Sequence, residues 1–120
     1  MKAQEAGKIV NTASVAGKEG NNNVAPYSAA KVGIIGLTKM LDKEMTLYNV
    51  HVNCVSPVLI DTDMAKGLTL DQWAFLTSKI PLGQLGKPEE VAAVVKFLVS
   101  DEASFVTGQC YEIGGGRSVF

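Results

Sequence analysis

Three side chains in the first third of the sequence have the types and spacing that proton transfer to an oxygen requires. Ser14 ends a β-rich run, and Tyr27 and Lys31 follow it 13 and 17 positions later. Tyr27 and Lys31 are four positions apart, so on a helix they share one face. A lysine ammonium beside a tyrosine stabilises the phenolate and lowers the tyrosine pKa from its usual value of about 10. A nearby serine hydroxyl can bond the same substrate oxygen, which suits a carbonyl/alcohol pair.

On the residues alone, this pattern has a second interpretation. A tyrosine and a lysine at this spacing also form an ordinary pair on a helix surface. Other chemistry has weaker support. Asp61 and Asp63 are better explained as helix caps than as metal ligands, so no metal site is predicted. Cys54 and Cys110 fall in predicted strands and are expected to be buried as small hydrophobic residues.

The elements that must position these side chains alternate between strand and helix. Their order predicts an α/β protein with a parallel sheet of about three strands, flanking helices and right-handed crossovers. At least one sheet edge is expected to lie open. The predicted strands span 8–14, 50–56 and part of 106–116, and the predicted helices span 27–47, 69–79 and the stretch that begins at 87.

Composition and charge exclude several classes of function. With 120 residues, 47% of them hydrophobic and 19% charged, the chain is suited to one small globular domain. A net charge of −1 offers no basic surface for nucleic acid or anionic lipid. No apolar run is long enough to cross a bilayer, and the N-terminus has no apolar signal-peptide core. We expect no nucleic-acid partner, no membrane partner and a cytoplasmic location.

The sequence around the trio resembles the short-chain dehydrogenase/reductase family, of the classical type. The run YSAAK, 13 residues after the serine of NTAS, is similar to the family's Ser–Tyr–Lys signature. VNCVSPVLIDTDM resembles the segment after its sixth strand, and PLGQLGKPEEVAAVVKFLVSDEASFVTGQ resembles its last helix and final strand. The similarity covers about residues 7 to 117. It is nearest to 3-oxoacyl-acyl-carrier-protein reductases, with sugar or sugar-acid dehydrogenases as neighbours.

This resemblance implies a fold and a role for each residue of the trio. The fold would be the C-terminal half of a Rossmann-like, doubly wound parallel sheet. Tyr27 would be the general acid in carbonyl reduction and the general base in alcohol oxidation. Lys31 would lower the Tyr27 pKa and bond the nicotinamide ribose, and Ser14 would hold the substrate carbonyl.

The implied cofactor is NAD or NADP, and further positions would contact it. The stretch from Pro57 to Thr62 would lie along the nicotinamide, with the backbone of Ile60 and the hydroxyl of Thr62 near the carboxamide. Asn11 would lie near the cofactor ribose. Tyr27 and Lys31 would belong to the cofactor site as well as to the catalytic trio.

The sequence also departs from the family. Val58 and Gly114 stand where the family commonly has glycine and an aspartate or asparagine. Nothing resembles the glycine-rich turn that cradles the pyrophosphate, the residue that selects NAD or NADP, or the asparagine that completes the proton relay. Met1 falls where the family's preceding helix ends. The expectation is that 1–120 form a partial oxidoreductase domain, the catalytic half without the nucleotide-binding half.

Two function hypotheses follow. In the first, the chain belongs to an NAD(P)-dependent oxidoreductase acting on a small carbonyl/alcohol substrate. In the second, it is a truncated, non-catalytic remnant or a dimerising module with a vestigial active site. The resemblance implies a homo-oligomer formed through the 27–47 helix and the C-terminal helix and strand. It also leaves Trp73, Phe75 and Leu76 as either substrate-covering or core residues.

Overall fold

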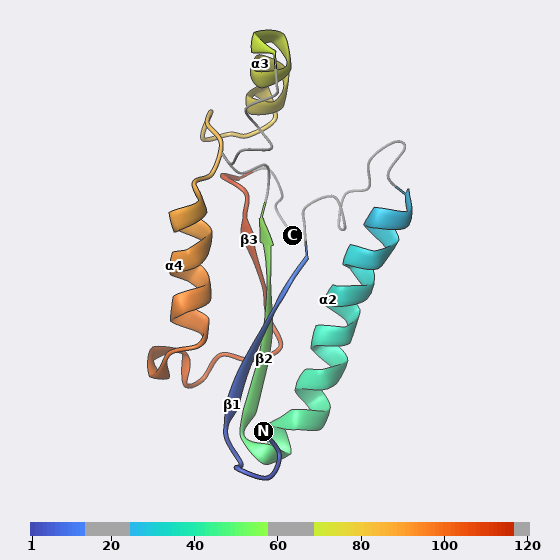
Figure 1. Cartoon of the computed structure of the whole chain (residues 1–120), viewed down its shortest axis with the longest axis vertical. Coiled ribbons are helices and arrows are strands. Elements are labelled where there is room, and N and C mark those ends of the chain that lie inside the picture. Colours follow the sequence, from blue (N-terminus) through green and yellow to red (C-terminus); the bar gives the residue numbers. More distant parts are fainter. Residues whose placement is uncertain (14–24, 58–68, 117–120) are drawn as a thin grey trace.

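Three parallel strands flanked by helices make up the protein, which confirms the predicted α/β class (Figure 1). The computed structural model describes residues 1–13, 25–57 and 69–116, with the backbone alone for 25–28. The carboxyl ends of all three strands point to the same end of the molecule, as parallel pairing requires.

The sheet has the order β1-β2-β3, with β1 (Gly7–Thr12), β2 (Val50–Pro57) and β3 (Cys110–Ile113). β1 pairs with β2 along its whole length, and β3 pairs with the second half of β2. In that second ladder Cys54 lies directly opposite Cys110. Among the described strands β1 and β3 are therefore the edges, and the expected open edge is confirmed.

The described helices are α2 (Ala25–Met45), α3 (Leu70–Ser78) and α4 (Pro88–Leu98), with short 3-10 turns η1 (Thr46–Tyr48) and η3 (Asp101–Ala103). α2 accepts a proline as its second residue because the first backbone N–H groups of a helix have no partner within it. α4 begins in the same way at Pro88.

α2 and α4 cover opposite faces of the sheet (Figure 1). β2 is consequently buried from both sides along almost its entire length. The two connections, β1 to β2 and β2 to β3, step across the sheet in the same direction. Helices on opposite faces then require crossovers of opposite hand, so the expectation that both are right-handed was wrong. One left-handed crossover is a rare arrangement among parallel sheets.

The core is the layer between β2 and the two helices. Val50, Val52 and Val55 of β2 are completely buried, and Leu98 of α4 and Ala103 of η3 join them. α3 contributes nothing to this core, because none of its residues is buried. On the apolar face predicted for α3, at Leu70, Trp73 and Leu76, the last two residues are half-buried and Leu70 is exposed. Leu70 is 87% exposed.

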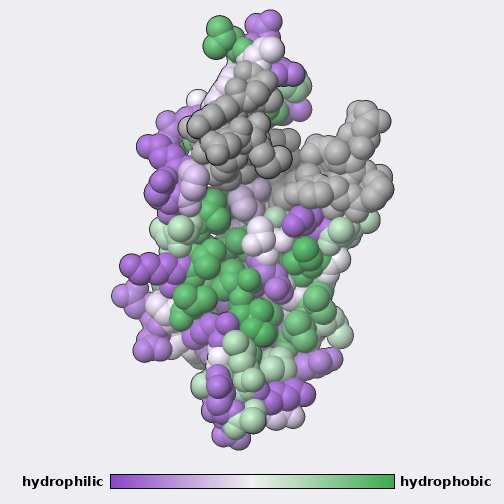
Figure 2. Space-filling view, in the orientation of Figure 1, coloured by the Kyte–Doolittle hydropathy of each residue, from purple (hydrophilic) through white to green (hydrophobic). Residues whose placement is uncertain are grey.

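Hydrophobic side chains also gather on the surface. Figure 2 shows them in the middle of the face that looks onto β1, between α4 and α2. Ile9 and Val10 of β1 are only half-buried, and the outer edge of that strand has no described partner. β1 thus presents both apolar surface and backbone hydrogen-bonding groups to a neighbour.

Candidate active site

The carboxyl ends of the three strands form the edge at which an open parallel sheet binds ligands. β1 continues its pairing beyond Thr12, since the Ala13 amide donates to the Val55 carbonyl at 2.7 Å. Ala13 is buried, and Pro57 ends β2 beside it, half-buried. At this edge the backbones of β1 and β2 are therefore held together by hydrogen bonding beyond Thr12.

Lys31 reaches this edge from the first part of α2. Its half-buried side chain donates from Nζ to the Thr12 carbonyl oxygen at 3.3 Å. The ammonium group is thereby held at the carboxyl end of β1. The structure thus brings together one predicted catalytic residue and the strand end that precedes another.

The other predicted site residues divide into two groups. Tyr27 lies in α2 one helical turn before Lys31, and only its backbone is described. Ser14 directly follows Ala13 but lies outside the described residues, as do Ile60 and Thr62. Their predicted roles stay predictions.

Asn11 has a contact that the sequence did not suggest. Its Nδ2 donates to Thr38 Oγ1 at 3.0 Å, and that hydroxyl in turn donates to the Ile34 carbonyl at 2.8 Å. Thr38 is buried within α2. Asn11 therefore ties β1 to α2, which fixes the helix that carries Lys31. Thr38 lies four residues after Ile34 and so on the same side of the helix, and this spacing was the signal that could have identified it.

A second set of bonds fixes the far half of α2. Asp42 accepts a hydrogen bond from the Thr107 hydroxyl, which itself accepts from the Val52 amide at 3.0 Å. Lys39 Nζ donates to the Gly108 carbonyl at 3.1 Å. Gly108 has a φ of +72°, and a Cβ there would collide with the Asp42 carboxylate. Together these contacts hold α2 against β2 and the turn that leads into β3.

Ser56 is a buried polar residue that sequence reasoning did not single out. It is fully buried near the end of β2, and its Oγ has no hydrogen-bond partner among the described residues. Strand side chains alternate between faces, and Cys54 is in register with Asn11, whose side chain meets α2. Ser56 therefore lies on the same face as α2 and Lys31. It adds a hydroxyl with hydrogen-bonding capacity to this edge.

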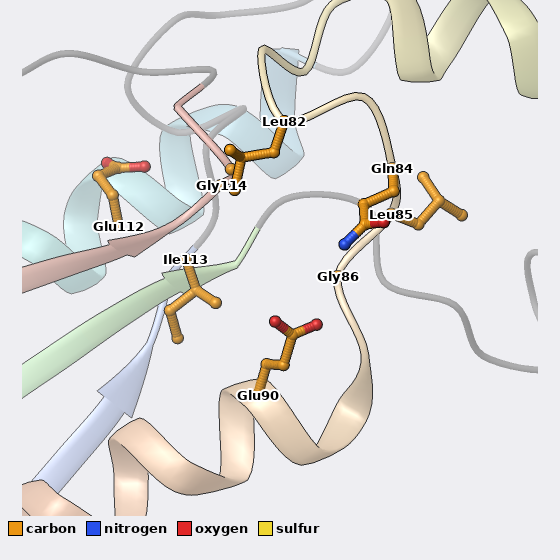
Figure 3. A pocket seen from close by; sticks show the side chains of 9 residues that line it. Leu82, Gln84, Leu85, Gly86, Glu90, Glu112, Ile113 and Gly114 are labelled. Carbon is orange, nitrogen blue, oxygen red and sulfur yellow. The ribbon is translucent and has the colours of Figure 1, made fainter.

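One cavity of about 150 Å³ lies on the other side of β3 (Figure 3). Ile113 and Glu90 point toward it, whereas Glu112 points away (Figure 3). Glu90 also accepts a hydrogen bond from the Lys87 amide at 2.8 Å, which caps α4. The cavity is smaller than the roughly 300–1,000 Å³ of ordinary ligand pockets. It lies where the end of β3 meets the start of α4.

The described residues contain neither a candidate metal site nor a candidate membrane-spanning helix. Residues 1–13, 25–57 and 69–116 hold no group of three or more His, Cys, Asp or Glu side chains that could bind a metal ion. None of the helices in these ranges has both the length and the apolar character needed to cross a bilayer.

Known proteins match nearly the whole chain. A family model described as enoyl-(acyl carrier protein) reductase covers residues 1–118. A 2-dehydro-3-deoxy-L-rhamnonate dehydrogenase (NAD(+)) from Sphingomonas sp. (strain SKA58) is 46% identical, over 95% of this chain and 46% of the relative. A 3-oxoacyl-[acyl-carrier-protein] reductase from Vibrio harveyi is 45% identical, over 97% of this chain and 48% of the relative.

A solved structure matches as closely. The crystal structure of a 3-oxoacyl-[acyl-carrier protein] reductase from Brucella melitensis ATCC 23457 superposes with a TM-score of 0.95 at 41% identity. The match covers 99% of this chain and 45% of that one. The chain thus spans about half the length of the relatives it matches.

Proposed function

The chain belongs to the short-chain dehydrogenase/reductase family, and on this basis we propose that it supplies the proton-transfer half of an NAD(P)-dependent carbonyl/alcohol oxidoreductase. The observation that carries the proposal is the bond from Lys31 Nζ to the Thr12 carbonyl at the carboxyl end of β1. It holds a cation one helical turn from Tyr27 and beside the strand end that leads to Ser14.

In reduction, the Tyr27 hydroxyl donates its proton to the substrate oxygen as the carbonyl carbon receives a hydride. In oxidation, the Tyr27 phenolate takes the proton of the alcohol. The Lys31 ammonium stabilises the phenolate and lowers the Tyr27 pKa, so both directions run nearer neutral pH. Ser14 donates a hydrogen bond to the same substrate oxygen and orients it toward Tyr27.

The side chains at this edge fit the nicotinamide end of NAD or NADP, which when bound supplies or accepts the hydride. Lys31 offers a cationic donor for ribose hydroxyls, and Ser56 offers a buried hydroxyl whose Oγ has no described partner. Pro57, Ile60 and Thr62 would border the ring. Asn11 would act indirectly, because its amide already bonds Thr38.

We also propose that residues 1–120 are one half of a larger α/β domain. The unpaired edge of β1 and the hydrophobic surface around it support this, as does the matched share of the relatives, 46% to 48%. The missing neighbour would be a parallel strand with its own helices, carrying the pyrophosphate site. A cytoplasmic location stays a prediction.

The substrate class that we propose is taken from the names of the relatives. Two alternatives are a 3-oxoacyl thioester and a sugar acid, because one relative is named for each. Both present a carbonyl/alcohol pair to the same trio. A homo-oligomer through α2 is supported by the exposed side chains Val32, Leu37 and Met40, which lie on the side of α2 away from the sheet.

The test is complementation. The chain is co-expressed with the N-terminal half of the Brucella melitensis enzyme, and NAD(P)H-dependent reduction of a 3-oxoacyl thioester and of a 2-keto sugar acid is measured. Tyr27→Phe should reduce the rate by about 10²–10⁴-fold, the usual contribution of a general acid. Tyr48→Phe is the matched control, since Tyr48 lies in η1 near Lys2. A fully active Tyr27→Phe variant would contradict the proposal.

The second candidate function is an associating module without catalysis. The half-buried Ile9 and Val10 at the open edge of β1 favour it. Calorimetric titration of the chain alone with NADH and NADPH distinguishes the two functions. Saturable micromolar binding would contradict the non-catalytic module. Absence of binding, with recovery when the N-terminal half is added, would support the split domain.

A further inference from the structure

α3 is attached to the rest of the protein differently from the other helices. It lies beyond the carboxyl ends of the strands (Figure 1), and no described helix or strand packs extensively against it. None of its residues is buried, and Phe75 is 60% exposed. Among its apolar side chains only Trp73 and Leu76 are half-buried, so side-chain packing holds α3 weakly.

The helix is nevertheless well formed, because its ends are satisfied locally. Thr69 caps its beginning: the Gln72 amide donates to the Thr69 hydroxyl at 3.2 Å, and the Gln72 side chain accepts from the Thr69 amide at 2.9 Å. At the other end the Ser78 hydroxyl donates to the Phe75 carbonyl at 2.6 Å. Such reciprocal capping satisfies backbone N–H groups that the start of a helix leaves unpaired. α3 is therefore held together largely by hydrogen bonds within its own segment.

The segment after α3 makes a close contact with the end of β3, which α3 itself does not make. Ile80 is only 3% exposed and rests against Gly115, where an added Cβ would lie 2.7 Å from its Cγ2. The Leu82 amide donates to the Gly115 carbonyl at 3.0 Å. Leu82 and the neighbouring Gly114 lie side by side in Figure 3. This contact joins the end of the α3 segment to the end of β3.

Glycine is required at this contact for two reasons. Gly115 and Gly116 have φ values of +58° and +91°, which side chains disfavour. At both positions a Cβ would press on the α3 segment, on Ile80 in one case and on Pro81, at 3.2 Å, in the other. Gly83 has a similar φ of +76° but open space around its Cβ position.

We propose that Ile80 seated on Gly115 is the hinge that positions α3 over the carboxyl end of the sheet, and that Ile80 and Gly115 are positioning residues for the substrate. The part that concerns substrate rests on the proposed function. α3 keeps its internal structure, and the Ile80–Gly115 contact sets its distance from the site. A change at this contact alters how the substrate is held, without touching Tyr27 or Lys31.

The test uses Trp73, the single tryptophan of the chain, as a reporter inside α3. In Ile80→Ala, Trp73 should show lower fluorescence anisotropy and faster quenching by acrylamide. Leu98→Ala is the matched control, because it removes an equally buried side chain, 1% exposed, from α4. It should lower the melting temperature and leave the Trp73 signals of the folded protein unchanged. Unchanged Trp73 signals in Ile80→Ala would overturn the hinge.

Gly115→Ala is the second variant, since it displaces Ile80 without removing its side chain, and Gly83→Ala controls for backbone strain alone. The Trp73 change should appear in Gly115→Ala and not in Gly83→Ala. In the complemented enzyme, Ile80→Ala should lose roughly 10–100-fold in kcat/KM for the carbonyl substrate, as expected for misplacement by about 1 Å. Equal Trp73 changes in both glycine variants would contradict the proposal. The fluorescence needs neither substrate nor cofactor, so it tests the hinge even if the proposed function fails.

Discussion

At the scale of single residues, Lys31 is the position on which the proposed chemistry depends most. If its cation lowers the Tyr27 pKa, then removing it returns that pKa toward about 10. Alcohol oxidation uses the phenolate, so its rate rises with pH through the Tyr27 pKa. In Lys31→Ala this rise should move to higher pH, with a lower rate at neutral pH. The pH–rate profile of the complemented enzyme measures the shift.

Lys43→Ala is the control for that profile, because Lys43 is exposed in the last turn of α2. Its profile should match that of the unchanged chain. A Lys31→Ala profile with the same midpoint and a lower plateau would show that Lys31 acts only in binding.

Gly108 is a residue whose replacement should destabilise the fold. Alanine there must adopt a φ of +72° and must displace the Asp42 carboxylate, which accepts from Thr107. Strain of this kind costs about 1–3 kcal/mol. We expect Gly108→Ala to lower the free energy of unfolding in urea by more than Gly83→Ala does, because Gly83 has the same backbone requirement without the clash. Equal losses would mean that the Asp42 contact contributes nothing.

At the scale of elements, mutations in α4 should lower the global free energy of unfolding, whereas mutations in α3 should have only local effects. Leu98 anchors α4 in the core, so Leu98→Ala should cost about 2–5 kcal/mol of global stability. Phe97→Ala, at the neighbouring and more exposed position, should cost clearly less. Chemical denaturation followed by circular dichroism measures both. Similar costs would indicate that α4 packs on another face.

For α3 the expected change is local. Thr69→Ala removes the N-cap and should cost about 1 kcal/mol of helix stability. Because α3 buries no residue, the global melting temperature should stay the same while Trp73 emission shifts. Ser78→Ala, which removes the hydroxyl bond at the other end of the helix, should have a similar local effect. A global loss comparable to that of Leu98→Ala would show that α3 is part of the cooperative core.

The elements also show what the sequence could predict. Periodicity located α2 and α4 because one side of each helix packs on the sheet. Alternation located β2, although this strand is buried on both faces. The same periodicity predicted an apolar face for α3 at Leu70, Trp73 and Leu76. Trp73 and Leu76 are only half-buried and Leu70 is exposed, because a pattern does not reveal how much partner surface is present.

The sequence did not predict the buried polar residues, for a related reason. Thr38 and Ser56 are fully buried, yet their types are usual on surfaces. The sequence also did not predict that the two crossovers have opposite hands, because the face on which each helix packs is set by tertiary contacts. Tyr27 and Lys31 were predictable as a pair because four positions on a helix define a face.

At the scale of the whole molecule, the outward side of α2 should govern self-association. Leu37→Glu or Met40→Glu places charge in the exposed hydrophobic stripe and should weaken association about tenfold or more, which corresponds to about 1.4 kcal/mol. Leu47→Glu is the control, since Leu47 is exposed in η1 and outside the stripe. Light scattering over a concentration series measures this. Equal effects would indicate nonspecific clustering.

The register of β2 and β3 has a chemical consequence. Cys54 and Cys110 lie opposite one another as thiols, one fully buried and the other half-buried. An alkylating reagent can reach Cys54 only when α2 lifts from its face of the sheet, whereas Cys110 is reachable after a smaller opening. The ratio of their two labelling rates under native conditions therefore compares the opening of α2 with the smaller opening at β3, without any denaturant and without any substitution.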